Sequence, residues 1–206
     1  MNARAMIKLY PALNATFAVL LSLSLSACEA PPAERITGTD ITGTPIGGAF
    51  SLLDKGGKTV TADQLKGQYR MIYFGYTFCP DVCPVDVAVM MQGFAKFAQA
   101  HPVRAAKVQP IFISIDPARD TPAAVGEFAA AFSPRLIGLT GTQAQIDAAV
   151  KAFKGYAARG SQSAGGYLMD HSRNTYLMDP DGKPLEVLPV DQGAEAVARD
   201  LAISVR

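Results

Sequence analysis

The sequence has few of the residues that bind metals or crosslink a chain, and it carries little net charge. Its 206 residues include only three cysteines and two histidines, and 19 Lys+Arg against 18 Asp+Glu give a formal net charge of +1. So few cysteines exclude the disulfide framework of small secreted domains. A chain this close to neutrality gives no indication of a nucleic-acid partner or of an acidic partner.

The sequence also lacks internal repeats and low-complexity stretches. Of its 206 residues, 49% are hydrophobic and 18% are charged, which is enough apolar sequence for one globular domain with its own core. We therefore expect a single domain that follows an N-terminal extension.

Residues 1–27 have the pattern of an export signal. Arg4 and Lys8 form a short positive region, and no charged residue follows from Leu9 to Ala27. The uncharged run ends in LSAC, which resembles a bacterial lipoprotein signal and implies cleavage before Cys28 and acylation of that residue. An uncleaved membrane anchor is the alternative, because the run is just long enough to span a bilayer. Both interpretations place the rest of the chain outside the cytoplasm.

Residues 28–45 are rich in proline, glycine and threonine, and predict a flexible tether behind the lipidated N-terminus. Glu29 follows the predicted acylation site, and an acidic residue at that position resembles a signal for retention in the inner membrane. We thus expect a lipid-anchored protein on the periplasmic side of a bacterial cell envelope, at the inner rather than the outer membrane.

The remaining residues, 46–206, alternate between short apolar runs and amphipathic segments. Thr121 with Pro122 and the turn DPDG mark a helix start and a hairpin. The expected strands are 50–53, 59–60, 69–76, 108–115, 136–139, 175–178 and 185–188, and the expected helices are 84–100, 122–132, 142–153 and 194–203. This alternation predicts an α/β domain with a mostly parallel central sheet, helices on its faces, and antiparallel strands at one side.

Two cysteines stand between a predicted strand and a predicted helix, in YFGYTFCPDVCP. Cys79 and Cys83 lie near the expected helix N-terminus, where the helix dipole and free N–H groups favour a thiolate. The pair is consistent with a disulfide staple, a thiol–disulfide catalyst or half of a metal site. A staple closing so short a loop would stabilise little, so metal binding or redox chemistry is favoured.

A metal site needs further ligands, and the chain offers two histidines. His101 is expected at the surface, at the end of the helix 84–100, whereas His171 precedes a strand and has an acid and a hydroxyl beside it in the order DHS. We expect residues 160–166, GSQSAGG, to form a flexible loop next to it.

The ligand types favour copper over zinc. Two thiolates and an imidazole form a soft, three-coordinate set that suits Cu(I) and that can hold Cu(II) with an added oxygen ligand. Zinc normally takes a fourth protein ligand in a closed site. The sequence offers only carboxylates for that place, such as Asp81, Asp86 or Asp170.

Three blocks of the sequence closely resemble the Sco/SenC family. They are YFGYTFCPDVCP (Tyr73–Pro84), SIDPARDTP (Ser114–Pro122) and DHSRNTYLMDPDG (Asp170–Gly182), with a weaker agreement at QLKG (Gln64–Gly67). In that order they cover the domain from about Gly48 to the C-terminus.

The resemblance implies a thioredoxin-like three-layer fold with a central mixed sheet, flanking helices and added β-hairpins. The family's copper ligands are the two cysteines of CPxxCP and the histidine of DHS, which correspond here to Cys79, Cys83 and His171. The domain 46–206 is thereby identified as a thioredoxin-like copper-binding domain.

The resemblance further implies a membrane-tethered copper metallochaperone, a binding protein rather than an enzyme. Such a protein delivers copper to the Cu-A centre in subunit II of cytochrome c oxidase or to a similar cuproprotein, and it can receive copper from an upstream donor. The alternative is a thiol–disulfide oxidoreductase that reduces the acceptor's cysteine pair through Cys79 and Cys83. Only the copper site requires His171.

The block DPARDTP has a structural and a functional interpretation. Asp116 before Pro117, and Thr121 before Pro122, are typical of a turn followed by a helix cap. Alternatively, Asp116, Arg119 and Asp120 form a charged partner surface beside the cysteine loop. We favour the structural interpretation.

Overall fold

The computed structural model describes residues 35–163 and 166–206. The predicted signal peptide, Cys28 and the first part of the predicted tether lie outside the described residues, so these assignments stay predictions. Among the described helices, none combines the length and the apolar character needed to cross a bilayer.

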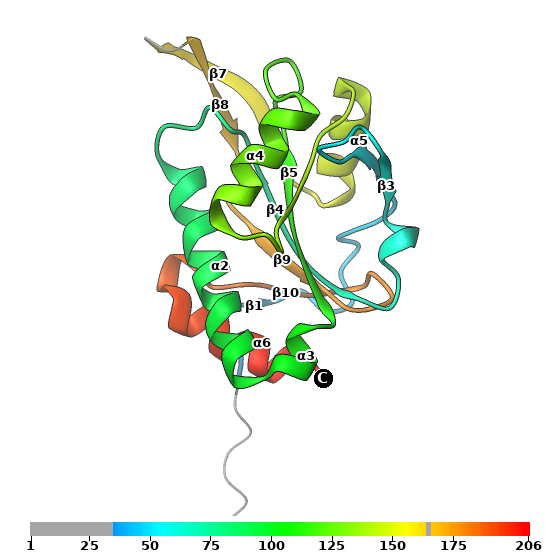
Figure 1. Cartoon of the computed structure of the whole chain (residues 1–206), viewed down its shortest axis with the longest axis vertical. Coiled ribbons are helices and arrows are strands. Elements are labelled where there is room, and N and C mark those ends of the chain that lie inside the picture. Colours follow the sequence, from blue (N-terminus) through cyan, green and yellow to red (C-terminus); the bar gives the residue numbers. More distant parts are fainter. Residues whose placement is uncertain (1–34, 164–165) are drawn as a thin grey trace, which may run out of the picture. The chain divides into compact units, whose positions relative to one another are not determined.

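A six-stranded mixed sheet forms the centre of the domain (Figure 1). Its order is β1 (Thr39–Asp40), β10 (Pro184–Val187), β9 (Thr175–Met178), β4 (Tyr69–Gly75), β5 (Val108–Ser114) and β6 (Ile137–Leu139). Strands β4, β5 and β6 are parallel, whereas β9, β10 and β1 pair antiparallel with their neighbours. The predicted mixed sheet with its antiparallel strands on one side is confirmed.

Strand β1 belongs to the stretch 28–45 that the sequence predicts as a tether. Thr39 pairs with Val187 of β10, and the side chain of Ile41 is buried. The folded part of the described chain thus begins before residue 46, with a short strand at the sheet edge.

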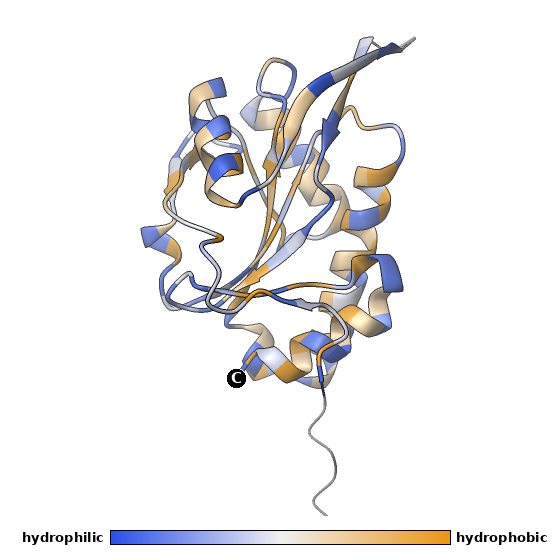
Figure 2. Cartoon of the chain, turned by 180° about the vertical axis from the view of Figure 1, so that it is seen from behind, coloured by the Kyte–Doolittle hydropathy of each residue, from blue (hydrophilic) through white to orange (hydrophobic). Residues whose placement is uncertain are grey.

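Helices cover both faces of the sheet. They are α2 (Val82–Ala100), the short α3 (Pro102–Ala105), α4 (Pro122–Phe132), α5 (Gln143–Ala152) and α6 (Ala194–Ser204), with single 3-10 turns at Asp63–Leu65 and Val190–Gln192. Figure 1 shows α2 and α4 in front of the sheet, and Figure 2, from behind, shows α5 in front of it at the upper left.

Side-chain contacts agree with this arrangement of layers. Strand β4 is buried along its whole length, so its alternate side chains enter two different core layers. Tyr73 stacks on Phe112, which in turn packs against Phe128 of α4, with ring centroids 4.7 Å apart in the second pair. Phe74 points to the other face, where it packs on Phe153 at the end of α5 at 5.3 Å.

Two hairpins lie outside the central sheet. The first pairs β2 (Ser51–Leu53) with β3 (Thr59–Thr61), as the sequence predicts. The second pairs β7 (Ala157–Ser163) with β8 (Gly166–His171), where the sequence predicts a flexible loop at 160–166. That prediction is wrong for the described residues of the segment, because Gln162 pairs with Tyr167 and only residues 164–165 lie outside the description.

The topology brings distant segments to one edge of the sheet. Strand β4 ends at Gly75 and is followed by the cysteine loop and α2, as in α/β sheets that bind ligands beyond the carboxyl ends of their strands. Strand β9 runs antiparallel to β4, with Thr175 opposite Tyr73. The start of β9, and with it the segment that contains His171, therefore lies beside the end of β4.

Candidate metal centre

Cys79 lies in the loop between β4 and α2, and Cys83 lies in the first turn of α2. Both are free thiols; the side chain of Cys83 is fully buried, and Cys79 keeps 9% of its surface exposed. The backbone N–H of Cys83 donates a hydrogen bond to the Cys79 sulfur over 3.3 Å. Asp81, at the N-cap position, makes no side-chain cap, so the Cys79 sulfur accepts one of the N–H groups that a helix start leaves free.

His171, at the end of β8, contacts the second cysteine. Its Nε2 atom lies 3.2 Å from Cys83 Sγ, and its Nδ1 atom lies 2.9 Å from the carbonyl oxygen of Ser172. A carbonyl can only accept, so Nδ1 carries the proton and the Nε2 lone pair faces the sulfur. The sequence placed an acid and a hydroxyl, those of Asp170 and Ser172, beside the imidazole, but the group that Nδ1 contacts is the Ser172 carbonyl, and the Ser172 hydroxyl accepts a hydrogen bond from the Tyr156 backbone.

Two tyrosine rings fix the plane of the imidazole. The rings of Tyr73 and Tyr76 both stand nearly perpendicular to the His171 ring, at centroid distances of 6.2 and 6.0 Å. Edge-to-face contacts on two sides restrict rotation of the ring about its side-chain bonds. His171 is therefore held in the orientation that aims Nε2 at Cys83.

The two thiols have pKa values shifted in opposite directions. For Cys79, burial raises the pKa, but hydrogen bonds from the Cys83 thiol and from the backbone N–H groups of Asp81 and Cys83 outweigh it, so the pKa lies below its ordinary value. For Cys83, burial dominates and raises the pKa far above that of a free thiol. Burial also lowers the pKa of His171, which keeps the imidazole neutral and available as a donor ligand.

An ion pair that the sequence did not suggest, between a buried carboxylate and an exposed arginine, lies next to the site. Asp86, only 4% exposed, accepts hydrogen bonds from Arg173 Nε at 3.0 Å and Arg173 Nη2 at 2.7 Å, and from the Tyr73 hydroxyl at 3.0 Å. The sequence offered Asp86 as a possible zinc ligand, but in the structure these three hydrogen bonds occupy its carboxylate. The one signal in the sequence is spacing, because Asp86 follows Cys83 by one helical turn.

The DPARDTP segment is built into the fold rather than exposed for a partner. Asp120 is 1% exposed and accepts hydrogen bonds from the Thr77 backbone and hydroxyl, at 3.0 and 2.6 Å, and from Ser114. Thr77 belongs to the cysteine loop, so Asp120 braces that loop. The expected N-cap is confirmed too, since Thr121 accepts a hydrogen bond from the Ala124 backbone.

Arg119 connects the same segment to the hairpin that contains His171. Its guanidinium pairs with Asp116 and lies 3.7 Å from the ring centroid of Tyr167 in β8. Phe78 of the cysteine loop is also within range, at 5.0 Å. Arg119 thus contacts both the hairpin and the cysteine loop and connects them.

The other candidate ligands do not join the site. His101 is the C-cap of α2, roughly 27 Å along the helix axis from Cys83 at 1.5 Å per residue. Asp81 and Asp170 are exposed at the surface. Within residues 35–163 and 166–206, no three Cys, His, Asp and Glu side chains are already clustered closely enough to hold a metal ion. To hold an ion together, the candidate ligands Cys79, Cys83 and His171 would have to move closer to one another.

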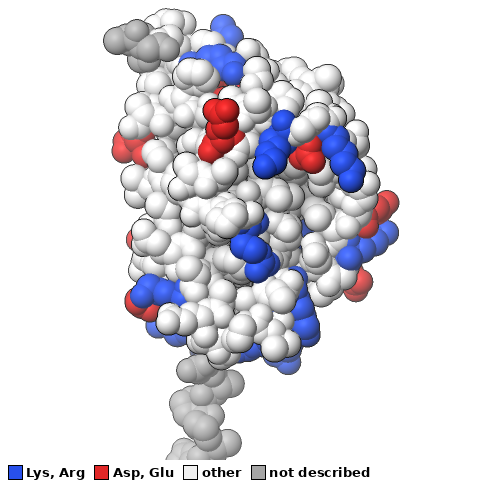
Figure 3. Space-filling model, viewed as in Figure 1, with Lys and Arg blue, Asp and Glu red and all other residues white. Residues whose placement is uncertain are grey.

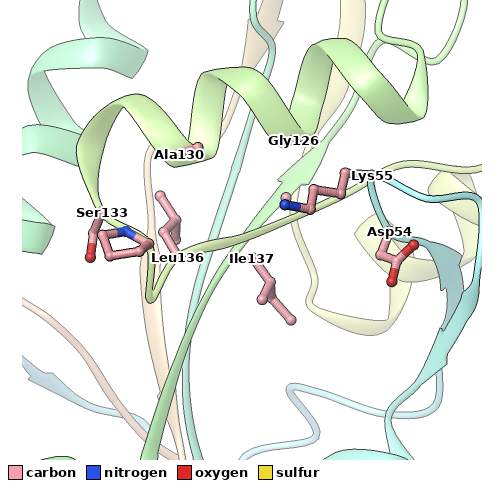
Figure 4. A pocket seen from close by; sticks show the side chains of 9 residues that line it. Asp54, Lys55, Gly126, Ala130, Ser133, Leu136 and Ile137 are labelled. Atoms are coloured by element: carbon pink, nitrogen blue, oxygen red, sulfur yellow. The ribbon is translucent and has the colours of Figure 1, made fainter.

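A pocket away from the two cysteines offers no better metal site. A pocket of about 310 Å³ lies between the hairpin β2–β3 and α4 (Figure 4). Asp54 and Lys55 contribute its only charged side chains, and none of its nine lining residues is a cysteine or a histidine. Figure 3 shows charges of both signs scattered over the face that α2 and α4 cover.

The donor atoms of the candidate site fit a soft monovalent metal. Two sulfurs and the Nε2 lone pair of a neutral imidazole match the ligand preference of Cu(I). The same two cysteines are also adjacent in space, because the backbone N–H of Cys83 lies 3.3 Å from the Cys79 sulfur, so thiol–disulfide chemistry is the alternative use of the pair.

Comparisons with known proteins agree on one family. The sequence model described as SCO1/SenC matches residues 38–206. The protein SenC of Rhodobacter capsulatus is 40% identical over 194 residues, which cover 91% of this chain and 86% of that protein.

Solved structures give the same answer. The copper-bound structure of ScoI from Bradyrhizobium japonicum has 40% sequence identity and a TM-score of 0.68, and the match covers 76% of this chain and 98% of that one. A structure of BsSco, described as having a disulfide switch and as a member of the Sco family of cytochrome c oxidase assembly proteins, has 25% identity and a TM-score of 0.57 over 84% of this chain and 99% of that one. These likenesses confirm the thioredoxin-like fold that the sequence predicts.

Proposed function

Because the chain belongs to the SCO1/SenC family, we propose that it is a copper metallochaperone whose ligands are Cys79, Cys83 and His171. The observation that carries the proposal is the 3.2 Å contact between Cys83 Sγ and the deprotonated Nε2 atom of His171. Residues 88 positions apart meet there with their donor atoms facing each other. A histidine with no role in metal binding does not need this orientation.

Copper binding changes the protonation of the site in a defined order. Cys79 has the lower pKa and the greater exposure, so its thiolate is the first ligand that an arriving ion meets. Cys83 then loses the proton that burial retains in the metal-free protein, and the ion replaces the contact between Cys83 and His171. Cu(I) is satisfied by these three ligands, and Cu(II) takes an additional oxygen ligand.

The acceptor is a cuproprotein of the cell envelope, and the Cu-A centre in subunit II of cytochrome c oxidase is the acceptor that the family suggests. BsSco is described as a cytochrome c oxidase assembly protein, which supports this choice. Cys79 is the one cysteine of the site with exposed surface, so the acceptor's ligands would displace it first. An upstream copper donor would load the site, and the predicted acylation of Cys28 would hold the protein at the periplasmic face of the inner membrane.

An anaerobic competition titration with a Cu(I) chelator tests the ligand set. We expect the reduced protein to bind one Cu(I) tightly, and we expect His171→Ala and Cys83→Ser each to weaken binding at least about tenfold. His101→Ala is the matched control, since that histidine lies at the far end of α2, and it should bind copper like the parent. Binding by His171→Ala that equals that of the parent would overturn the proposal.

A thiol–disulfide oxidoreductase is the second candidate, and the contact between the Cys83 backbone and the Cys79 sulfur favours it. The backbone N–H of Cys83 donates to the Cys79 sulfur over 3.3 Å, and the pKa of Cys79 lies below its ordinary value, as an attacking thiol requires. In this role the pair would reduce an oxidised cysteine pair of the acceptor, and Cys79 and Cys83 would end as a disulfide. His171→Ala separates the two candidates, because it removes a copper ligand and leaves both thiols in place.

A further inference from the structure

The segment that contains Cys83 and the segment that contains His171 make a second contact, a few residues further along the sequence of each. On α2, Asp86 follows Cys83 by three residues, and after β8, Arg173 follows His171 by two. Cys83 faces His171 at 3.2 Å, and Asp86 faces Arg173 at 2.7 and 3.0 Å. The two contacts are parallel links between the same pair of segments.

The contact between Asp86 and Arg173 fixes both the distance and the orientation of the two side chains. Arg173 binds both oxygens of the Asp86 carboxylate through Nε and Nη2, and such a two-point contact sets the orientation as well as the distance of the two groups. The Asp86 side chain is 5% exposed, whereas the Arg173 side chain is 54% exposed. The buried partner of the ion pair is therefore on the helix, and the arginine binds it from the solvent side.

Tyr73 joins the two links through the central sheet. Its hydroxyl donates to Asp86 at 3.0 Å, and its ring stands edge-on to the His171 ring. The buried carboxylate and the half-buried imidazole therefore both contact the buried tyrosine. Arg173 is only two residues from His171 in the chain, so a displacement of Arg173 would also shift the backbone that carries the imidazole.

We propose that Asp86 and Arg173 are positioning residues for the metal site, which hold the His171 segment against α2 so that the imidazole reaches an ion bound by Cys79 and Cys83. This inference rests on the proposed copper function. It assigns no ligand role to either residue: the ion pair determines whether the third ligand is in place before the metal arrives. The gain for metal binding is preorganisation, because the site then needs less ordering of the His171 segment on loading.

A double-mutant cycle on Cu(I) affinity tests the inference. We expect Arg173→Met to weaken Cu(I) binding about tenfold in the parent and by less than about twofold in a His171→Ala background. An ion pair that supports only the general fold would weaken binding equally in both backgrounds. Arg173→Lys, which keeps the charge but loses the two-point contact, should fall between Arg173→Met and the parent.

The control removes an ion pair of the same helix that lies away from the site. Lys96 pairs with Glu195 at 2.7 Å across the contact of α2 with α6, so Lys96→Met should leave Cu(I) affinity unchanged in both backgrounds. Circular dichroism verifies that each variant is folded, and Arg173→Lys keeps the test available if Arg173→Met unfolds. A second readout is the nitrogen coupling in the electron paramagnetic resonance spectrum of the Cu(II) form, which Arg173→Met should weaken.

The possible failures are distinguishable. If His171→Ala weakens copper binding but Arg173→Met and Arg173→Lys do not, or if the arginine and histidine effects simply multiply, the positioning role is overturned and the copper site stands. If His171→Ala itself binds copper as the parent does, the proposed ligand set and the inference both fail.

Discussion

Cys79 and Cys83 are four positions apart in the sequence and differ in both access and protonation. Cys79 is 9% exposed with a lowered pKa, and Cys83 is fully buried with a raised pKa. The thiolate is the reactive form of cysteine, so the two residues should behave differently towards an electrophile.

Alkylation of the reduced, metal-free protein measures this difference. At pH 8 we expect iodoacetamide to modify Cys79 at least about tenfold faster than Cys83, as followed by mass spectrometry of the two peptides. In Cys79→Ser, the remaining thiol at position 83 should stay slow. Equal rates for the two thiols would show that α2 does not protect Cys83 as the structure describes.

Glu186 on β10 links stability to pH. It is 1% exposed, and burial, followed by the nearby charges of Asp200 and Asp40, raises its pKa from 4.5 to about 7. Between these two values the folded state holds a proton that the unfolded state has released, so stability is lost as the pH rises through that window.

Replacing this carboxyl by an amide should remove that loss. We expect Glu186→Gln to unfold at higher urea concentration than the parent above pH 7, with a gain of up to about 3 kcal/mol, and to show little difference below pH 5. Glu127→Gln, at an exposed position of α4, is the control and should leave the pH profile of the parent unchanged. The same pH slope in Glu186→Gln and the parent would contradict the shifted pKa.

At the scale of elements, the segment from β4 to α2 was predictable and the hairpin β7–β8 was not. The largely apolar run YRMIYFG indicates a buried strand, and Pro84 indicates the first turn of the helix that follows. The sequence AARGSQS of β7 has no apolar alternation, because its described residues are exposed or half-buried rather than part of the core. Its attachment depends on contacts such as Arg119 with Tyr167, which no local pattern reveals.

The candidate ligands could be named from the sequence, whereas the residues that contact and orient them could not. Cys79 and Cys83 follow a strand, and the structure confirms that position. The ion pair of Asp86 with Arg173 joins residues 87 positions apart, and a sequence read locally cannot show such a pairing. The same is true of the Ser172 carbonyl that fixes the His171 tautomer, since every residue has a carbonyl and only the fold selects one.

The contact of α2 with α6 depends on one glycine. A Cβ atom at Gly93 would lie 2.6 Å from Val197 Cβ and 3.0 Å from the Ala194 carbonyl oxygen. We expect Gly93→Ala to destabilise the domain by about 1–2 kcal/mol, because the strain of overpacking exceeds the helix propensity that alanine adds.

Urea unfolding of Gly93→Ala measures this packing. The control is Gln92→Ala at an exposed position of the same helix, which should stay within about 0.5 kcal/mol of the parent. If Gly93→Ala is as stable as the parent, α2 and α6 pack less closely than the structure has them.

At the scale of the whole domain, the start of the described chain and the candidate site lie at opposite ends. The first described residues and β1 lie at the lower end of Figure 1, and the loop after β4 with the hairpin β7–β8 lies at the upper end. The sheet edge at the upper end gathers the candidate ligands from the loop 76–81, from α2 and from β8. The two sulfurs and the imidazole nitrogen of the candidate site therefore lie far from the first described residues.

The central claim is that Cys79, Cys83 and His171 together bind copper. X-ray absorption at the copper edge of the Cu(I)-loaded protein tests it most directly, because sulfur and nitrogen ligands scatter at different distances. We expect a three-coordinate site with two sulfur ligands and one nitrogen ligand, and we expect His171→Ala to lose the nitrogen and keep both sulfurs. A spectrum with sulfur ligands alone, or one that His171→Ala leaves unchanged, would contradict the account.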